Sequence, residues 1–185
     1  MSSGDAKRAL TAHSSTPCDA VRSLEVSVRV RKPGVLVLDY ALKADTSRLS
    51  IAPIRASVRA DELWRHTCFE AFVRPAGSAG YFELNFSPST QWAAYRFDSY
   101  RNGMAPAQQV GIPQISLDLS QGLLRLKAAV AIGELATLPD DALLQVGLNA
   151  VIEAETGGLS YWALRHAAGK PDFHHPDAFA LEMQT

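Results

Sequence analysis

Apolar and polar residues alternate along three consecutive segments of the chain, and this period of two predicts three β-strands. The segments span residues 66–74, 81–87 and 92–98. One side of each strand is apolar, and we expect these sides to point into a shared core; they carry Phe69, Ala71 and Val73, then Phe82, Leu84 and Phe86, then Ala93, Tyr95 and Phe97. If the strands pair as a meander, their opposite sides bring polar groups together.

The same alternation recurs along much of the chain. Further strands are expected at residues 24–31, 35–43, 115–119, 124–129, 143–155, 159–164 and 179–183. Many short strands separated by turn residues, with no sustained helical period, predict an all-β fold: a single antiparallel β-sandwich of the jelly-roll type. The Ser-, Ala- and Thr-rich residues 1–23 are interpreted as a flexible leader, and the domain is expected to span residues 24–185.

Composition excludes several classes of partner. The net charge of the 185-residue chain is -1 and no cluster of Lys and Arg is present, which argues against binding to nucleic acid or to an anionic membrane surface. No apolar run approaches the length of a membrane span. With only two cysteines, Cys18 and Cys68, and no signal peptide, we expect no disulfide framework and a cytoplasmic location.

The polar side of the three-strand meander carries the candidate binding chemistry. Its residues are Glu70, Glu83, Asn85, Trp92 and Arg96. Carboxylate, amide and guanidinium groups can bind hydroxyls while aromatic rings cover C–H faces, so this set favours a polyhydroxylated ligand. Two alternatives remain open: Glu70 and Arg96 form an ordinary cross-strand ion pair, and Trp92 lies in the core if the strand's phase shifts by one residue.

A second informative segment lies near the C-terminus. Trp162 closes a predicted strand and is followed by a loop that carries His166, Lys170, Asp172, His174 and His175. Two adjacent histidine rings do not readily turn to one ion, and no set of residues has the spacing of known metal ligands, so we predict no metal site. A loop held by polar contacts is the simpler interpretation.

Three stretches carry a resemblance to a known group of proteins: LWRHTCFEAFVRP, YFELNFSPSTQWAAYRF and the final YWAL…KPDFHHPDAF. They resemble bacterial DOMON-like proteins, which belong to a wider group that includes the family-9 carbohydrate-binding modules, and the similarity covers most of the chain after the leader. In sugar-binding members the pattern W-x-x-x-x-x-E precedes Y-x-E-x-N-x-S-P, and the fold is a β-sandwich. The matching residues here are Trp64, Glu70, Tyr81, Glu83, Asn85, Ser87 and Pro88.

The resemblance implies a binding site in which two tryptophans clamp a sugar ring. Trp64 and Trp162 would be the two walls, and Arg96 and Asn149 would belong to the polar rim. Calcium is a further implied cofactor, because related modules hold it. The resemblance assigns no role to residues 170–179.

We therefore predict a non-catalytic module for a saccharide or similar polyol, with no catalytic residues. One alternative, also implied by the resemblance, is a haem-binding cytochrome-like domain that uses Met104 with His166, His174 or His175; the missing signal peptide makes it the less favoured one. Another is an enzyme acting on sugars, in which Glu70 and Glu83 serve as an acid/base pair.

Overall fold

The computed structural model describes residues 7–31, 34–133, 137–139 and 141–185, and it confirms the all-β antiparallel fold. The strands are β1 (Arg8–Ala12), β2 (Val21–Arg31), β3 (Val35–Ala44), β4 (Cys68–Pro75), β5 (Tyr81–Phe86), β6 (Trp92–Phe97), β7 (Ala105–Pro106), β8 (Gln114–Ser120), β9 (Leu123–Ala131), β10 (Leu143–Glu153), β11 (Leu159–Ala163) and β12 (Leu181–Gln184). Every predicted strand is present to within a few residues at its ends.

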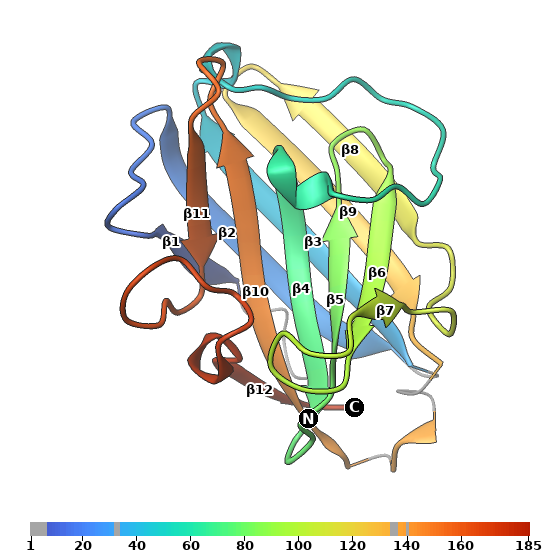
Figure 1. Cartoon of the computed structure of the whole chain (residues 1–185). Helices are drawn as coiled ribbons and strands as arrows, with labels where there is room; N and C mark the ends of the chain where they lie inside the picture. The colour runs from blue at the N-terminus through green and yellow to red at the C-terminus, as the bar shows by residue number, and fades with distance from the viewer. Residues whose placement is uncertain (1–6, 32–33, 134–136, 140) are drawn as a thin grey trace.

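The strands form the two layers of a β-sandwich (Figure 1). One layer has the order β8-β9-β3-β2, and the other has the order β7-β6-β5-β4-β10-β11, with β12 paired to one end of β10. Strand β1 pairs with β2 and with β11, so it joins the layers at one side. The layer that contains β4, β5 and β10 has one face in the sandwich core and one outer face, which is turned towards the viewer in Figure 1.

Part of the segment interpreted as a flexible leader is a strand of the sandwich. Residues 8–12 form β1, in which Leu10 is buried and opposite Leu24 of β2, while Thr11 is opposite Ala163 of β11. A strand with one buried apolar side chain and hydrogen-bonding neighbours on both sides belongs to the sandwich. The low content of large apolar residues in this segment concealed it from sequence analysis.

The space between the layers is filled by the apolar sides of the strands. The buried side chains from the outer-faced layer include Phe69, Val73, Phe82, Leu84 and Phe86, and those from the other layer include Leu24, Leu36, Leu38, Tyr40 and Leu126. The predicted phases of β4 and β5 are therefore confirmed.

The predicted phase of β6 is wrong. Glu83 is opposite Tyr95 and Phe82 is opposite Arg96, so Tyr95 lies on the outer face with Glu83. Phe97 shares that outer face, whereas Trp92 points into the core, where the Arg59 guanidinium lies 4.5 Å from its ring centroid. Both sides of β6 are largely apolar, so alternation alone did not distinguish them.

Helical structure in the described ranges is limited to 3-10 turns: η1 (Thr46–Arg48), η2 (Leu63–Arg65) and η4 (Pro176–Ala178). Among these residues, no helix has the length and hydropathy needed to cross a membrane. The sequence also predicts a short helical turn at residues 132–138, before Pro139, and this segment falls partly outside the described residues. Turn η4 lies against β10 at Gly147, where an added Cβ would be 3.0 Å from the carbonyl oxygen of Ala178.

Candidate functional site

A row of polar side chains crosses the outer face of the sheet. Asn149 of β10 is opposite Glu70 of β4, and Glu70 is opposite Asn85 of β5. Glu83 lies two residues from Asn85 on the same strand, and Asn85 Nδ2 donates a hydrogen bond of 2.8 Å to Glu83 Oε1. All four side chains are buried although they face away from the sandwich core. Something other than the second layer therefore covers them.

The cover is a second cluster of apolar side chains built on the outer face. Its buried members are Phe72, Tyr81, Ala93, Tyr95, Phe97, Val151, Ala163, Phe173 and Phe179, and Leu63, Trp64, Leu159 and Tyr161 pack against them. Phe173 and Phe179 belong to the loop after β11, and Leu63 and Trp64 belong to η2. Two loops distant in sequence are thus fixed over the sheet by apolar burial.

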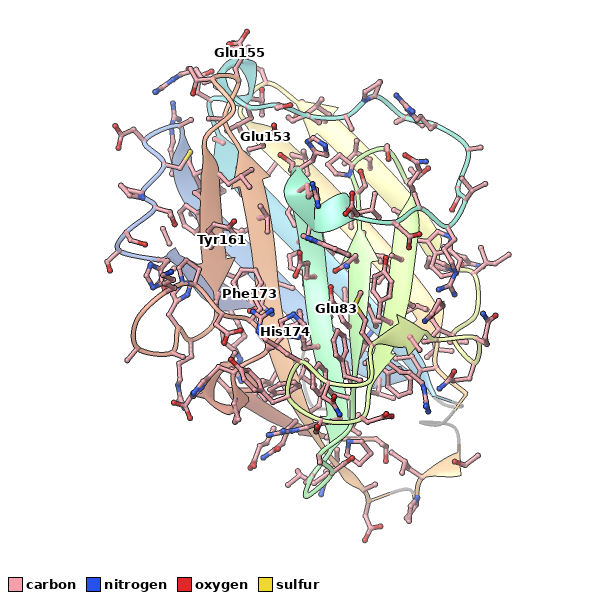
Figure 2. All side chains as sticks on the ribbon, viewed as in Figure 1. Glu83, Glu153, Glu155, Tyr161, Phe173 and His174 are labelled. Carbon is pink, nitrogen blue, oxygen red and sulfur yellow. The ribbon has the colours of Figure 1, made fainter. Side chains whose placement is uncertain are left out.

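Between these loops and the sheet lies a cavity of about 330 Å³. Its lining consists of Trp64, Glu70, Phe72, Glu83, Phe97, Arg101, Met104, Val151, Tyr161, Pro171, Phe173 and His174. Figure 2 labels four of the lining residues, which lie in front of the sheet in the order Tyr161, Phe173, His174 and Glu83 from left to right. The cavity therefore combines two buried carboxyl groups with several aromatic rings.

The structure corrects the prediction that Trp162 is a wall of the site. Tyr161 is opposite Val151 and Trp162 is opposite Ala150, so the tyrosine faces the cavity and the tryptophan faces the core. The Trp162 indole donates a 2.9 Å hydrogen bond to the buried Ser160 hydroxyl. Trp64 and Trp162 consequently lie on opposite sides of one sheet and do not form a clamp.

Trp64 does line the cavity. It lies in η2, which starts after Glu62 in a left-handed conformation (φ 60°), and its ring makes an edge contact with Tyr95 at 5.7 Å between centroids. Tyr161 and Phe173 also line the cavity, and their ring centroids are 5.9 Å apart. The aromatic surfaces available to a ligand are therefore one tryptophan, one tyrosine and phenylalanines.

Arg96, the predicted polar rim residue, is not part of this site. The alternation of β6 puts Arg96 on the same side as the core residues, near the edge of the layer. Its side chain is half exposed there, and its Nη2 lies 3.4 Å from Asp98 Oδ1. Arg101 is the arginine that lines the cavity. It follows β6 in a turn, has a positive φ of 52°, and makes a 2.7 Å ion pair with Asp172 of the loop after β11.

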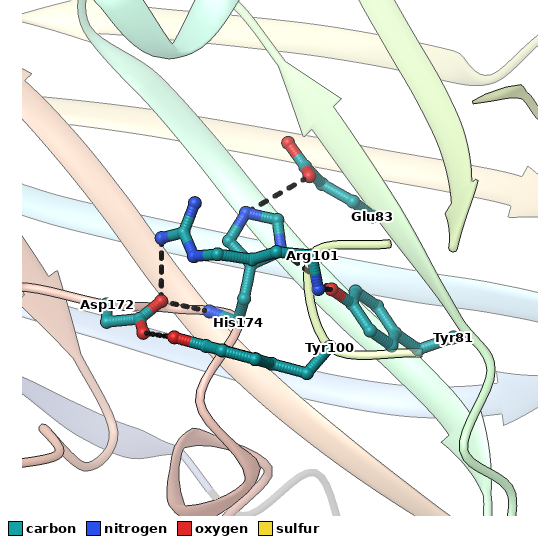
Figure 3. Close-up of polar contacts among 6 residues, drawn as sticks. All are labelled: Tyr81, Glu83, Tyr100, Arg101, Asp172 and His174. Atoms are coloured by element: carbon teal, nitrogen blue, oxygen red, sulfur yellow. Dashed lines mark hydrogen bonds and ion pairs between the residues drawn. The ribbon is translucent and has the colours of Figure 1, made fainter. Parts of the chain in front are cut away.

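The polar network around Asp172 holds the C-terminal loop over the cavity (Figure 3). The Tyr100 hydroxyl donates to one Asp172 oxygen at 2.6 Å, and the His174 backbone N–H donates to the other at 3.1 Å. Asp172 thus ties the loop after β11 to the loop after β6 through Arg101 and Tyr100. The prediction of a loop held by polar contacts is confirmed for this segment.

His174 connects this network to the buried carboxyl group of Glu83. The Tyr81 hydroxyl accepts a 3.2 Å hydrogen bond from the Arg101 backbone N–H and lies 2.8 Å from His174 Nδ1. In the tautomer in which the Tyr81 hydroxyl donates to Nδ1, the ring proton is on Nε2, which lies 3.7 Å from a Glu83 oxygen. Burial, with a contribution from the Arg101 charge, lowers the pKa of His174 to about 4, so the ring is neutral near pH 7.

Burial has the opposite effect on the two carboxyl groups. It raises the pKa of Glu70 well above its ordinary value, and the nearby Glu83 raises it further. Burial also raises the pKa of Glu83 to about 7, although the Asn85 hydrogen bond and the Arg101 charge act against this. Two carboxyl groups close enough to affect each other do not both ionise readily in a poorly solvated place.

Several buried polar atoms under the cavity have no hydrogen-bond partner among the described residues: Glu70 Oε1, Asn85 Oδ1, and both side-chain polar atoms of Asn149. Leaving a buried polar group unpaired costs about 1–3 kcal/mol, so such atoms are rare and call for a physical explanation. A ligand or water that supplies hydrogen bonds is the simplest one. The described residues include no group of three or more His, Cys, Asp or Glu able to hold a metal ion.

Cys68 begins β4 next to this polar row, and we expect its thiol to react slowly with alkylating reagents. The side chain is fully buried, and burial together with Glu70 and Glu83 raises the pKa of the thiol well above its usual range. In Cys18→Ser protein, iodoacetamide should label Cys68 only after denaturant is added. In Cys68→Ser protein the half-buried Cys18 should react faster, and rapid labelling of native Cys68 would contradict the expectation.

Sequence analysis missed Tyr161, Phe173 and Arg101 as site residues. Tyr161 was detectable as the neighbour of Trp162, because exactly one of two adjacent strand residues can face the site. Phe173 and Arg101 lie in loops, where no periodicity indicates the direction of a side chain. His174 was considered only as a metal or haem ligand, whereas in the structure both ring nitrogens face protein groups.

Comparison with solved structures finds proteins that share this fold. No protein-family model and no curated protein matches the chain. A proposed carbohydrate-binding protein from Bacteroides uniformis has a similar structure, with a TM-score of 0.69 and 15% identity over 94% of this chain and 84% of the other. A family-9 carbohydrate-binding module from Caldicellulosiruptor kristjanssonii, in complex with glucose, has a TM-score of 0.56 and 8% identity over 95% of this chain and 83% of the other. A family-9 module from the same organism, in complex with cellotriose, has a TM-score of 0.54 and 10% identity over 89% of this chain and 74% of the other. At these identities the likeness shows a shared fold.

Proposed function

We propose that this protein is a non-catalytic module that binds a saccharide or similar polyol in the cavity on the outer face of the sandwich. The observation that carries the proposal is the row of buried carboxyl and amide groups, with unpartnered polar atoms, beneath an aromatic-lined cavity. Hydroxyl groups of a sugar can both donate and accept, so they suit this mixed set. The rings of Trp64 and Tyr161 offer apolar surfaces for the C–H faces of the sugar.

Two further facts support this proposal. The cavity of about 330 Å³ is at the lower end of the range for small-molecule sites, which extends from roughly 300 to 1,000 Å³. The modules with the same fold that hold glucose and cellotriose make a saccharide the natural first class to test. The DOMON-like relationship, a bound calcium ion and the cytoplasmic location stay predictions.

The test is a screen of mono- and disaccharides by calorimetry and tryptophan fluorescence. Trp64 is partly exposed, whereas Trp92 and Trp162 are buried in the core, so a bound sugar should change the emission of Trp64 alone. Trp64→Phe should abolish the fluorescence change while calorimetry still detects binding, because a ring remains. Trp162→Phe is the matched control and should keep both signals.

Removing the rings should weaken binding strongly. Trp64→Ala or Tyr161→Ala removes a covered aromatic face, and loss of a buried large apolar side chain costs about 1.5–3 kcal/mol, or roughly 10- to 150-fold in Kd. Binding that survives both substitutions in folded protein would contradict this site. Turnover of an aryl glycoside by the wild-type protein would contradict the non-catalytic part of the proposal.

The haem alternative has one observation in its favour, since Met104 and His174 line the same cavity. Against it, His174 Nδ1 is hydrogen-bonded to Tyr81 and Nε2 faces Glu83, so neither nitrogen is free to ligate iron. The floor also carries two buried carboxyl groups, a poor surface for an apolar macrocycle. Titration with hemin should therefore produce no six-coordinate spectrum, and its appearance, lost in Met104→Ala and His174→Ala, would support haem instead.

A further inference from the structure

Most of the unpartnered atoms in the polar row at and below the cavity are hydrogen-bond acceptors. The Asn85 amide is oriented by its donation to Glu83, which leaves its Oδ1 as an acceptor without a donor. Glu70 Oε1 and Asn149 Oδ1 also lack partners, against a single unpartnered donor on Asn149. Glu70 lines the cavity whereas Asn85 and Asn149 lie beneath it, so Glu70 Oε1 is the unpartnered atom that an N–H or O–H group of a ligand can reach.

The charges that line the cavity are unbalanced. Glu70 and Glu83 are its two acids, and both are almost completely buried. Arg101 is the lining residue that carries a permanent positive charge, and its guanidinium is already engaged by Asp172 at 2.7 Å. His174, the other basic residue of the lining, is neutral near pH 7. Neither acid makes an ion pair with an arginine or a lysine among the described residues, and burial raises both pKa values, so a cation bound beside them would let them ionise.

The walls suit a cation as well as they suit a sugar. Rings of Trp64, Phe72, Phe97, Tyr161 and Phe173 line the cavity. The negative face of an aromatic ring attracts an ammonium group, and cages of such rings recognise amines. Rings alone do not separate a neutral sugar from an amine, but rings beside two acids without a free counter-charge favour the amine.

We propose that the ligand of this cavity carries a protonated amine, and that within the saccharide class the site selects amino sugars over neutral sugars. The ammonium group would lie beside the Glu70 and Glu83 carboxylates, which line the cavity, and donate its N–H groups to their oxygens. The sugar part of this inference rests on the proposed function, whereas the amine part rests on the charge and acceptor balance of the cavity.

The experiment compares four probes at pH 7 by calorimetry and Trp64 fluorescence: glucosamine, glucose, N-acetylglucosamine and tetramethylammonium. Glucosamine has the charged amine, N-acetylglucosamine has the same skeleton without the charge, and tetramethylammonium has the charge without the sugar. We expect glucosamine to bind at least tenfold more tightly than either neutral sugar. Glu70→Gln and Glu83→Gln should each reduce this preference to less than threefold, because glutamine keeps the shape and removes the charge.

The matched control is Glu25→Gln, which neutralises a partly exposed carboxylate on β2 in the opposite layer and should leave the preference intact. Equal binding of glucosamine and glucose would overturn the amine inference and leave the proposed function standing. Binding of tetramethylammonium without any of the sugars would support the amine inference and contradict the saccharide function. If none of the four probes binds, both are overturned.

Discussion

Replacing Leu84 by alanine is expected to lower the free energy of unfolding by about 2–5 kcal/mol. Leu84 is the central residue of β5, it is almost fully buried between the two layers, and its cross-strand neighbours are Ala71 and Ala94. Because both neighbours are small, they cannot extend into the space that the missing side chain leaves. The loss of stability should therefore include the cost of an unfilled cavity as well as the free energy that burial of the leucine side chain contributes.

Urea unfolding followed by circular dichroism measures this effect. The matched control is Leu119→Ala, since Leu119 also lies in a strand but is half exposed on β8 at the edge of the opposite layer. Its loss should stay below about 1 kcal/mol because little buried area disappears. A Leu84→Ala protein with the wild-type midpoint would show that β5 does not point its even-numbered residues into the core.

The core could be predicted where one side of a strand is apolar and the other is not. In β4 and β5, Glu70, Glu83 and Asn85 mark the side that cannot enter the sandwich, so their phase was determined by the sequence alone. In β6 the residues Ala93 and Ala94 are uninformative, and the aromatic residues on both sides are buried in different clusters. A strand covered on both faces loses the alternation that sequence analysis uses.

The site was predictable in its floor and not in its walls. Glu70, Glu83 and Asn149 come from strands, where register determines direction, and the structure brings them together with Asn85. The walls come from η2, the turn at Arg101 and the loop after β11, which are placed by contacts between segments about 70 residues apart, such as the Arg101–Asp172 pair. A single sequence contains no local signal for such contacts.

The stability of the protein should depend on pH through the buried groups of the site. For Glu83, the pKa is 4.5 in its ordinary state and about 7 when folded, so the folded state binds the proton more tightly. The Glu83 contribution is therefore most favourable below pH 4.5 and is lost as the pH rises to about 7. A shift of this size corresponds to roughly 3 kcal/mol. The pKa of Glu70 is raised in the same direction, so it adds to the same trend.

His174 should act in the opposite direction over much of the same range. Its pKa falls from 6.5 to about 4 on folding, so the unfolded state binds its proton more tightly. Its contribution is fully present above pH 6.5 and is lost as the pH falls towards 4. Between pH 4.5 and 6.5 the slopes from Glu83 and His174 partly cancel, and above 6.5 the slope from the carboxyl groups remains.

Single variants should separate the two trends. In Glu83→Gln protein, which can keep the Asn85 hydrogen bond, stability should fall with pH between 4.5 and 6.5 less than in the wild type, because the His174 trend is then opposed by Glu70 alone. In His174→Gln protein, stability should fall with pH more steeply than in the wild type over that range, because the opposing histidine trend is gone. The measurement is the free energy of unfolding in urea at pH 4.5, 5.5, 6.5 and 7.5, with Glu25→Gln as a control that should follow the wild type. If the profiles of both site variants run parallel to the wild type, neither group is buried as the structure places it, and the cavity floor that both the saccharide and the amine proposals require does not exist in solution.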